Sequence, residues 1–367
     1  MLAFIIISIL YFLLSFLVGN RIYKSINKVN KLNKIVYWCI FAFISSSFII
    51  YETATYNLPS ILNKVLAFIS SYYLAFFAYI LMLFPIAFIL TKLLKPKNNK
   101  LDFYMISLLI TTLIVGIGTF LANSPYVKEY TISTDKQLKD GKLKIALVSD
   151  LHLGYFRGNN RIDLLKSELN KLGADVVIIA GDLVDGNLDP IIEDNMFSHL
   201  KDIKSTYGTY FATGNHDFYT GKVDELCTLL TEQGIHILRN ESTLINDEFY
   251  ILGRDDVTAD RLGTKRPPLD NMSSNIDNNK FSILIDHNPQ NIKEAEGDNI
   301  DLQVSGHTHK GQIIPGNLIT HAIFPLDYGY GKFGNTNLVV SSGYGLWGPP
   351  IRTGSRSEIV LITLSNK

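Results

Sequence analysis

Five short clusters hold the side chains whose types and spacing could do chemistry. Aspartate, asparagine and histidine supply all of their candidate ligands, and cysteine supplies none. Mixed oxygen and nitrogen donors indicate a site for Mn²⁺, Fe²⁺ or Zn²⁺ rather than a structural zinc site made of thiolates. The clusters are Asp150-x-His152, Gly181-Asp182, Gly214-Asn215-His216-Asp217, His287 and Gly306-His307-Thr308-His309.

The spacing within two clusters supports a metal site. At an extended strand end, residues i and i+2 point to the same side, so Asp150 and His152 can converge, and so can His307 and His309. Glycines at positions 181, 214 and 306 permit sharp turns and close backbone approach. Each cluster alone is a weak signal, because short motifs often arise for structural reasons, and the prediction depends on their combination. The remaining histidines are interpreted as ordinary surface or core residues: His199, His236 and His321.

The elements that must position these clusters form an alternating pattern. Apolar, strand-like stretches precede the clusters, at residues 144–148, 175–180, 209–213, 281–285 and 302–304. Helical periodicity lies between them, at 161–172, 190–203 and 223–233. Such alternation predicts an α/β fold with a largely parallel sheet, which binds ligands at the carboxyl ends of its strands. Residues 338–342 and 358–363 predict strands of a second sheet, and 264–280 predict an exposed loop.

The charge distribution divides the chain of 367 residues into two regions. The total is neutral, with 34 basic and 34 acidic residues. Residues 1–123 contain ten basic and two acidic residues, and residues 124–367 contain 24 and 32. All eight histidines fall in the second region, and the two cysteines, Cys39 and Cys227, exclude a disulfide-dense scaffold. We therefore expect a membrane region at 1–123 and a catalytic domain at 124–367.

Four charge-free stretches in the first region are long enough to cross a bilayer. They cover residues 1–20, 35–51, 65–91 and 103–127, and about 17 to 25 apolar residues suffice for a span. The third contains Pro85 and predicts a single tilted or kinked helix. None of the stretches contains Asp, Glu, Lys, Arg or His, which argues against a transporter with ionisable relays.

The loops predict the orientation of these spans in the cell membrane. The loops at 20–34 and 92–102 are basic, and the loop at 52–64 carries only Glu52 and Lys64. Basic loops stay in the cytoplasm, so both termini of the four-span region and the whole catalytic domain are predicted to be extracytoplasmic.

The ordered motifs resemble those of the calcineurin-like metallophosphoesterases. The matching segments are SDLHLG (149–154), GDLVDG (181–186), GNHDFY (214–219), DHNP (286–289), GHTHKGQ (306–312) and YGLWGPPIRTG (344–354). The chain is most similar to a membrane-associated bacterial branch that includes UDP-2,3-diacylglucosamine pyrophosphatase-like proteins. The resemblance implies a four-layer αββα sandwich with a dinuclear metal centre, here preceded by an all-α region of four transmembrane helices.

The resemblance also implies a role for each site residue. One metal would be held by Asp150, His152, Asp182 and His309. The second would be held by Asp182, Asn215, His287 and His307, so that Asp182 bridges the two. His216 would act on the phosphate or leaving group, and Asp217 would orient it. Lys310 replaces a glycine that is usual in this branch, and we expect its side chain to point to solvent.

Together these features predict a membrane-anchored, metal-dependent phosphoric ester hydrolase. A hydroxide bridging two divalent ions, with Mn²⁺ preferred over Fe²⁺ or Zn²⁺, would attack a phosphodiester, pyrophosphate or phosphomonoester while His216 assists. We expect a lipid-linked or cell-envelope substrate, contact with membrane lipids, and aromatic residues that could line its site: Tyr328, Tyr330, Phe333, Tyr344 and Trp347.

Three alternatives to this function stay open. A nuclease or nucleotide phosphodiesterase of the same superfamily is disfavoured because the acidic domain should repel nucleic acid. A membrane receptor or scaffold with a non-catalytic domain would be expected to lack a ligand, and none is missing. A transporter with an appended domain is disfavoured because the predicted spans contain no ionisable residues.

Overall fold

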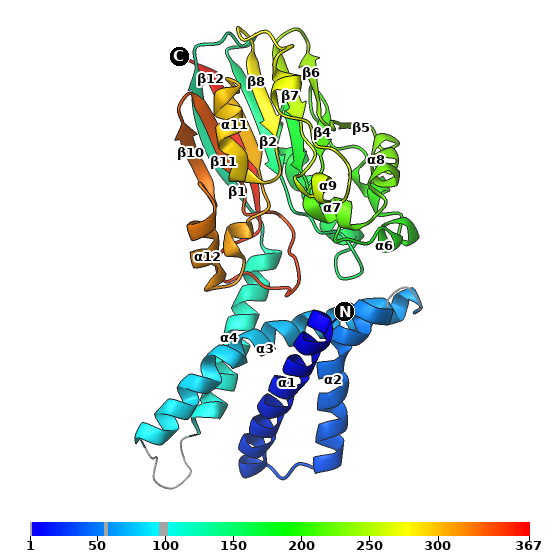
Figure 1. The fold of residues 1–367 in the computed structure, drawn as a ribbon, viewed down its shortest axis with the longest axis vertical. Helices are drawn as coiled ribbons and strands as arrows, with labels where there is room; N and C mark the ends of the chain where they lie inside the picture. Colours follow the sequence, from blue (N-terminus) through cyan, green and yellow to red (C-terminus); the bar gives the residue numbers. More distant parts are fainter. Residues whose placement is uncertain (1, 55–57, 95–101) are drawn as a thin grey trace. The chain divides into compact units, whose positions relative to one another are not determined.

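The computed structural model describes residues 2–54, 58–94 and 102–367 (Figure 1). The chain divides into two compact units, Met1–Phe120 with Gly348–Ile351 and Leu121–Trp347 with Arg352–Lys367. The first unit is helical. Its helices are α1 (Leu2–Val29), α2 (Lys34–Ala54), α3 (Ser60–Leu94) and, as far as Phe120, α4 (Phe103–Asn123).

All four helices are long and apolar enough to cross a membrane, which confirms that there are four spans and indicates a membrane protein. Helix α1 continues to Val29, so Arg21, Lys24 and Lys28, predicted in a loop, lie in this helix. Helix α3 runs as one element with Pro85 inside it. The predicted fourth stretch extends too far, because Tyr126 and Val127 belong to a strand. Pro125 explains the early stop, since proline disfavours helical backbone in the residue before it. Most of the second basic loop, at residues 95–101, and part of the middle loop, at 55–57, lie outside the described residues.

The second unit contains two six-stranded sheets. The first has the order β1-β12-β2-β3-β4-β5 and is parallel except between β12 and β2. Its strands are β1 (Tyr126–Thr134), β2 (Lys142–Val148), β3 (Val176–Ala180), β4 (Thr209–Ala212), β5 (Ile235–Ile237) and β12 (Glu358–Asn366).

The second sheet has the order β10-β11-β9-β8-β7-β6, with antiparallel pairs only at its two edges. Its strands are β6 (Glu241–Ile245), β7 (Phe249–Gly253), β8 (Phe281–Ile285), β9 (Leu302–Ser305), β10 (Gly329–Phe333) and β11 (Thr336–Val340).

Short helices connect and cover these strands. They are α5 (Asn159–Leu172), α6 (Asp189–Glu193), η3 (Met196–Leu200), α7 (Asn215–Tyr219), α8 (Val223–Thr231), α9 (Thr258–Arg261), α10 (Asp270–Ser273), η4 (Pro289–Asn291), α11 (Ile292–Gly297), η5 (His309–Gly311) and α12 (Gly316–Ile323).

Three apolar cores produce the layered arrangement. Residues such as Ile178 and Ile283 pack between the two sheets. A second core joins the other face of the first sheet to α5 and α8, through Leu165 and Leu226. A third joins the second sheet to α10 and α11, through Ile292. The predicted four-layer αββα sandwich is thereby confirmed.

Three predictions about the elements are wrong in part. The helix expected at 190–203 is divided into α6 and η3, because Asn195 takes a left-handed conformation with φ 47°. Strand β12 belongs to the first sheet, between β1 and β2, rather than to the second. The loop at 264–280 is not simply exposed, since Leu269, Met272 and Ile276 are buried against the second sheet.

Candidate active site

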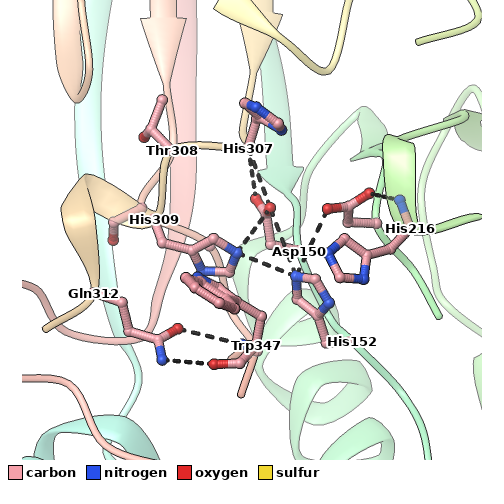
Figure 2. Close-up of polar contacts among 12 residues, drawn as sticks. Asp150, His152, His216, His307, Thr308, His309, Gln312 and Trp347 are labelled. Carbon is pink, nitrogen blue, oxygen red and sulfur yellow. Dashed lines mark hydrogen bonds and ion pairs between the residues drawn. The ribbon is translucent and has the colours of Figure 1, made fainter. Parts of the chain in front are cut away.

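All five clusters lie at the carboxyl ends of strands in the two sheets. Asp150 and His152 follow β2, Asp182 follows β3, and α7 begins directly after the end of β4. His287 follows β8, and His307 and His309 follow β9. The seven predicted ligands therefore come from both sheets, and the structure brings them together. Figure 2 labels Asp150, His152, His307 and His309 among them.

The first predicted ligand set converges on the Asp150 carboxylate. Asp150 Oδ1 lies 3.2 Å from His309 Nε2 and 3.9 Å from His152 Nε2. The same His152 nitrogen lies 3.7 Å from Asp182 Oδ2. Figure 2 shows the rings of His152 and His309 beside Asp150. One ligand atom of each of Asp150, His152 and His309 lies within 4.8 Å of the others, as a metal site requires.

The second predicted set is arranged around the other side of Asp182. Its Oδ2 lies 3.2 Å from His287 Nε2, and Asp182, His287 and His307 form another group with ligand atoms within 4.8 Å. Asn215 Oδ1 lies 2.8 Å from His307 Nδ1. Asp182 Oδ1 accepts a 2.8 Å hydrogen bond from the His216 backbone N–H, so Oδ2 is the oxygen placed between the two sets.

The chemistry of the donors fits a cation at this point. His287 Nδ1 donates to the Ala180 carbonyl at 2.7 Å, so Nε2 of a neutral ring carries a lone pair. That buried nitrogen has no hydrogen-bond partner among the described residues, yet it faces the Asp182 carboxylate. His152 Nδ1 likewise faces an acceptor, Asp185 Oδ1, at 3.2 Å. Lone pairs that face one another across a buried carboxylate are stabilised by a positive charge between them, which either a metal ion or a proton on a ring can supply.

The pKa values of three buried groups fit the same interpretation, and that of a fourth does not. Burial lowers the pKa of His287, but Asp182 and then Asp150 raise it well above its ordinary value, so a proton on this ring competes with a metal ion. Burial raises the pKa of Asp150, but His309, His287 and His152 lower it further, so the carboxyl is ionised. Burial lowers the pKa of His309 to about 4 and also lowers that of His307, which keeps both rings neutral. Metal binding needs ionised carboxylates and neutral imidazoles.

The backbone achieves this convergence in a way that the sequence did not predict. Asp150, His152, Asp182, His307 and His309 have φ values of 54°, 46°, 50°, 69° and 50°. These left-handed conformations replace the extended strand ends expected from the i and i+2 spacing. They cost on the order of 1–3 kcal/mol each and occur at functional sites where the surrounding structure enforces them.

The glycines have the predicted role of close approach. A Cβ atom at Gly214 would overlap the Asp182 carboxylate, and one at Gly306 would overlap the Asp150 carboxylate. A side chain at either position would push a candidate ligand away from its place.

His216 stands next to the predicted ligands with a different partner from the one expected. Its ring lies 4.6 Å from the His152 ring, edge to face, and its Nδ1 lies 3.3 Å from Asp185 Oδ1. Asp217, expected to orient His216, instead accepts hydrogen bonds from the backbone amides of Leu183, Val184 and Gly214. Burial, and then the charge of Asp182, raises the pKa of Asp217 to about 7.

The electrostatic surroundings of His216 favour its protonated form. Burial lowers its pKa, but Asp185 and then Asp182 raise it above the ordinary value for histidine. The ring is also close to the proposed ligands, because His216, His152 and Asp182 have ligand atoms within 4.8 Å of one another. A protonated imidazole at this position can donate to a phosphate or a leaving oxygen.

Two residues of the site were missed in the sequence. Asp185 contacts both His152 and His216, and its place three residues after Asp182 in the GDLVDG motif was the available signal. Arg352 is fully buried. Its Nη2 donates to the carbonyls of Gly343 and Gly345 at 2.9 and 2.8 Å and lies 3.4 Å from His309 Nδ1. No local pattern distinguishes it from a surface arginine.

The structure agrees with the prediction for the other three histidines and differs from the prediction for Lys310. The histidines expected to be ordinary lie outside the cluster: His199 contacts Asp163, His236 stacks on Tyr210, and His321 is exposed. Lys310 does not simply point to solvent, because its Nζ lies 4.1 Å from the centre of the Tyr328 ring.

Two of the aromatic residues expected to line the site, Tyr344 and Trp347, differ in their burial. Tyr344 is buried in the core beside the first sheet, whereas Trp347 is about half exposed. Trp347 contacts Gln312 through its backbone, as Figure 2 shows.

Comparison with known proteins agrees with this site. The family model for calcineurin-like phosphoesterases matches residues 143–311. An uncharacterized metallophosphoesterase of Helicobacter pylori (strain J99) is 30% identical over 95% of this chain and 94% of its own length. One of Campylobacter jejuni is 31% identical over 99% of both chains. A Danio rerio transmembrane protein with metallophosphoesterase domain is 33% identical over 71% of this chain and 62% of its own. The chain therefore belongs to the calcineurin-like metallophosphoesterase family, which hydrolyses phosphate esters.

Proposed function

We propose that the chain is a membrane-anchored phosphoesterase that uses two divalent ions to hydrolyse a phosphodiester, pyrophosphate or phosphomonoester. We assign residues 1–123 to the anchor and 124–367 to the catalytic domain. The observation that carries the proposal is the position of Asp182 Oδ2, which faces His287 on one side and His152 on the other. A single carboxylate shared by two ligand sets is what a two-metal site needs.

The ligand sets proposed for the two ions follow from these contacts. Asp150, His152, Asp182 and His309 would hold one ion, and Asp182, Asn215, His287 and His307 would hold the other. The ions, when bound, supply a water of low pKa and neutralise charge on the phosphoryl group. Because the donors are oxygen and imidazole, we propose Mn²⁺ first, with Fe²⁺ or Zn²⁺ as alternatives.

The protein's own acid in this proposal is His216. With Nδ1 directed at Asp185, Nε2 is the ring nitrogen that can reach a leaving oxygen. Asp185 and Asp182 raise its pKa above the ordinary value for histidine, which favours a proton on the ring and suits a general acid. Asp217 then acts indirectly, since it holds the turn that carries His216 by binding the Gly214 amide.

For the substrate, we propose a lipid-linked or cell-envelope phosphate ester reached from outside the cytoplasm. Four membrane-spanning candidates in the same chain support a lipid substrate, because anchoring raises the local concentration of lipid head groups. The basic segment at 20–34, which includes the last residues of α1, supports the orientation. The resemblance to the UDP-2,3-diacylglucosamine pyrophosphatase-like branch favours a pyrophosphate bond. Uridine nucleotides are normally cytoplasmic, however, so an outward domain would act on a different lipid pyrophosphate.

A hydrolysis assay on the purified full-length protein tests the activity. We expect Mn²⁺-dependent turnover of an aryl phosphodiester or monoester, loss of turnover with chelator, and loss in Asp182→Asn and His216→Ala. A matched control is Asp189→Asn, which removes a carboxylate that contacts Lys222 and should retain activity. Full activity in Asp182→Asn would contradict the shared-carboxylate site.

Two further measurements address the finer proposals. A substrate panel of lipid-linked diphosphates, nucleotide diphosphates and cyclic nucleotides should give the highest kcat/KM with a lipid-linked member. Protease added to intact cells should cleave the catalytic domain if it is extracytoplasmic, and complete protection until lysis would contradict that orientation.

A further inference from the structure

Helix α12 (orange in Figure 1) is the one helix of the second unit, among the described residues, with no buried residue. Its side chains are nonetheless strongly apolar. Leu318, Ile319 and Ile323 are 68%, 60% and 56% exposed, and Ile314, just before the helix, is 48% exposed. We call these four residues the α12 patch.

The segment around the α12 patch lacks the charges that normally keep a surface helix in water. Residues 311–326 contain no Asp, Glu, Lys or Arg. Surface helices usually place charged or polar side chains on the solvent side, and a contiguous exposed apolar patch generally marks an interaction surface. The α12 patch is therefore expected to be covered in the working protein.

The helix is fixed to the loop that carries two of the proposed metal ligands. Thr308 Oγ1 donates to the Asp327 carbonyl at 2.6 Å, and Thr320 Oγ1 donates to the Asp327 carboxylate at 2.8 Å. The Phe324 ring, directly after α12, lies 5.8 Å from the His307 ring, edge to face. Whatever covers the patch thus lies beside the candidate active site.

The chain itself indicates which partner is within reach. Helix α4 ends at Asn123 and β1 begins at Tyr126, so only residues 124 and 125 connect a membrane-spanning candidate to the first sheet. A connection of two residues reaches at most about 7 Å. The connection therefore keeps the beginning of β1 close to the end of α4, and so to the surface of a bilayer that α4 would cross.

We propose that the α12 patch inserts into the interfacial region of this bilayer, next to the His307–His309 loop. Short amphipathic helices bind membranes in this way, with the apolar side chains at the boundary between head groups and acyl chains. The contact would bring lipid head groups to the metal-ligand loop, which deepens the proposed lipid-linked substrate. The contact requires only that the chain be anchored in the membrane. The proposed contact can therefore be wrong while the proposed hydrolysis is correct.

Tryptophan fluorescence can test this contact, because the chain contains only Trp38 and Trp347. The full-length protein with Trp38→Phe, Trp347→Phe and Leu318→Trp is reconstituted into phosphatidylcholine and phosphatidylglycerol vesicles. Bromine atoms on the acyl chains quench a tryptophan that reaches them. Leu244→Trp in the same background is the matched control, because Leu244 is 39% exposed on β6, the edge strand opposite β10. Ile319→Trp supplies a second reporter should the first variant fold poorly.

We expect the reporters at 318 and 319 to lose most of their emission in brominated vesicles, while the reporter at 244 keeps its emission. Adding Ile323→Ser should reduce the quenching. Emission at 318 and 319 that is unaffected by bromine would overturn the proposal. In that case, a blue-shifted spectrum would indicate that protein, such as a second copy of the chain, covers the patch. Hydrolysis of a soluble aryl phosphate, measured on the same variants, reports on the proposed function separately.

Discussion

Asp185 connects the proposed metal site to the proposed general acid, so its replacement is an informative perturbation. One oxygen, Oδ1, lies 3.2 Å from His152 Nδ1 and 3.3 Å from His216 Nδ1. Asp185→Asn keeps the shape of the side chain and removes its charge. The variant should leave both rings in place but weaken their orientation and remove the negative charge that raises the pKa of His216.

The expected loss follows from these two contacts. Removing a partner that orients a metal-ligating histidine typically costs 10–100-fold. The Asp185 side chain is 42% exposed, so solvent screens part of its charge and limits the electrostatic contribution. We therefore expect kcat/KM to fall by about 10–100-fold, which corresponds to about 1.4–2.7 kcal/mol of transition-state stabilisation.

The pH profile should also change in a defined direction. If protonated His216 donates to the leaving group, activity declines as the pH rises through its pKa. Asp185 raises that pKa, so in Asp185→Asn the alkaline decline should begin at a lower pH than in the parent protein. A role that was only structural would lower the rate without moving the profile.

The assay is Mn²⁺-dependent hydrolysis of an aryl phosphate ester by full-length protein, with kcat/KM measured across a pH series. Asp189→Asn is the control, because Asp189 is 39% exposed and contacts Lys222 instead of a histidine. An Asp185→Asn enzyme with kcat/KM within experimental error of the parent and an unchanged alkaline decline would refute this reasoning.

Three other outcomes are expected. Mn²⁺ at 100 times Kd should stabilise the folded protein by about 2.7 kcal/mol per site. Chelation should therefore lower the melting temperature, added Mn²⁺ should restore it, and an unchanged melting curve would contradict a bound ion. Gly214→Ala should reduce the metal content measured by mass spectrometry, since its Cβ overlaps the Asp182 carboxylate, and full occupancy would oppose this. Arg266→Ala should destabilise the fold by about 3–5 kcal/mol, because it leaves the buried Asp286 carboxylate without one of its arginines. Its control in thermal denaturation is the exposed Arg261→Ala, and equal melting temperatures would count against the ion pair.

Local properties of the sequence were sufficient for the broad organisation. The four membrane helices were predictable because a span requires a run of apolar residues, which is visible along the chain. The ligand types were predictable for a similar reason, since strands that end in Asp, Asn and His bring these side chains to one edge of a sheet. Asp150 and His309, for example, lie far apart along the chain, yet the motif resemblance assigns them to the same ion and their side chains are in contact.

Contacts between distant segments could not be predicted in the same way. Strand β1 pairs in parallel with β12, beginning with Tyr126 opposite Glu358, and neither strand has a local pattern that identifies its neighbour. The segment 264–280 reads as an exposed loop because it is rich in polar residues, yet Met272 packs on the second sheet and Arg266 pairs with Asp286. Burial of such residues depends on which surfaces the rest of the chain presents.

The sequence by itself therefore determined the four membrane-span candidates and the α/β pattern, and the resemblance of its motifs implied the αββα class and the seven candidate metal ligands. Only the tertiary structure decided that Asp185, rather than Asp217, faces His216 and that five of the ligands adopt left-handed backbone conformations. The physical reason is that hydropathy and ligand chemistry belong to individual residues. The direction of a side chain, by contrast, depends on backbone angles that are stable only when distant strands and loops hold them in place.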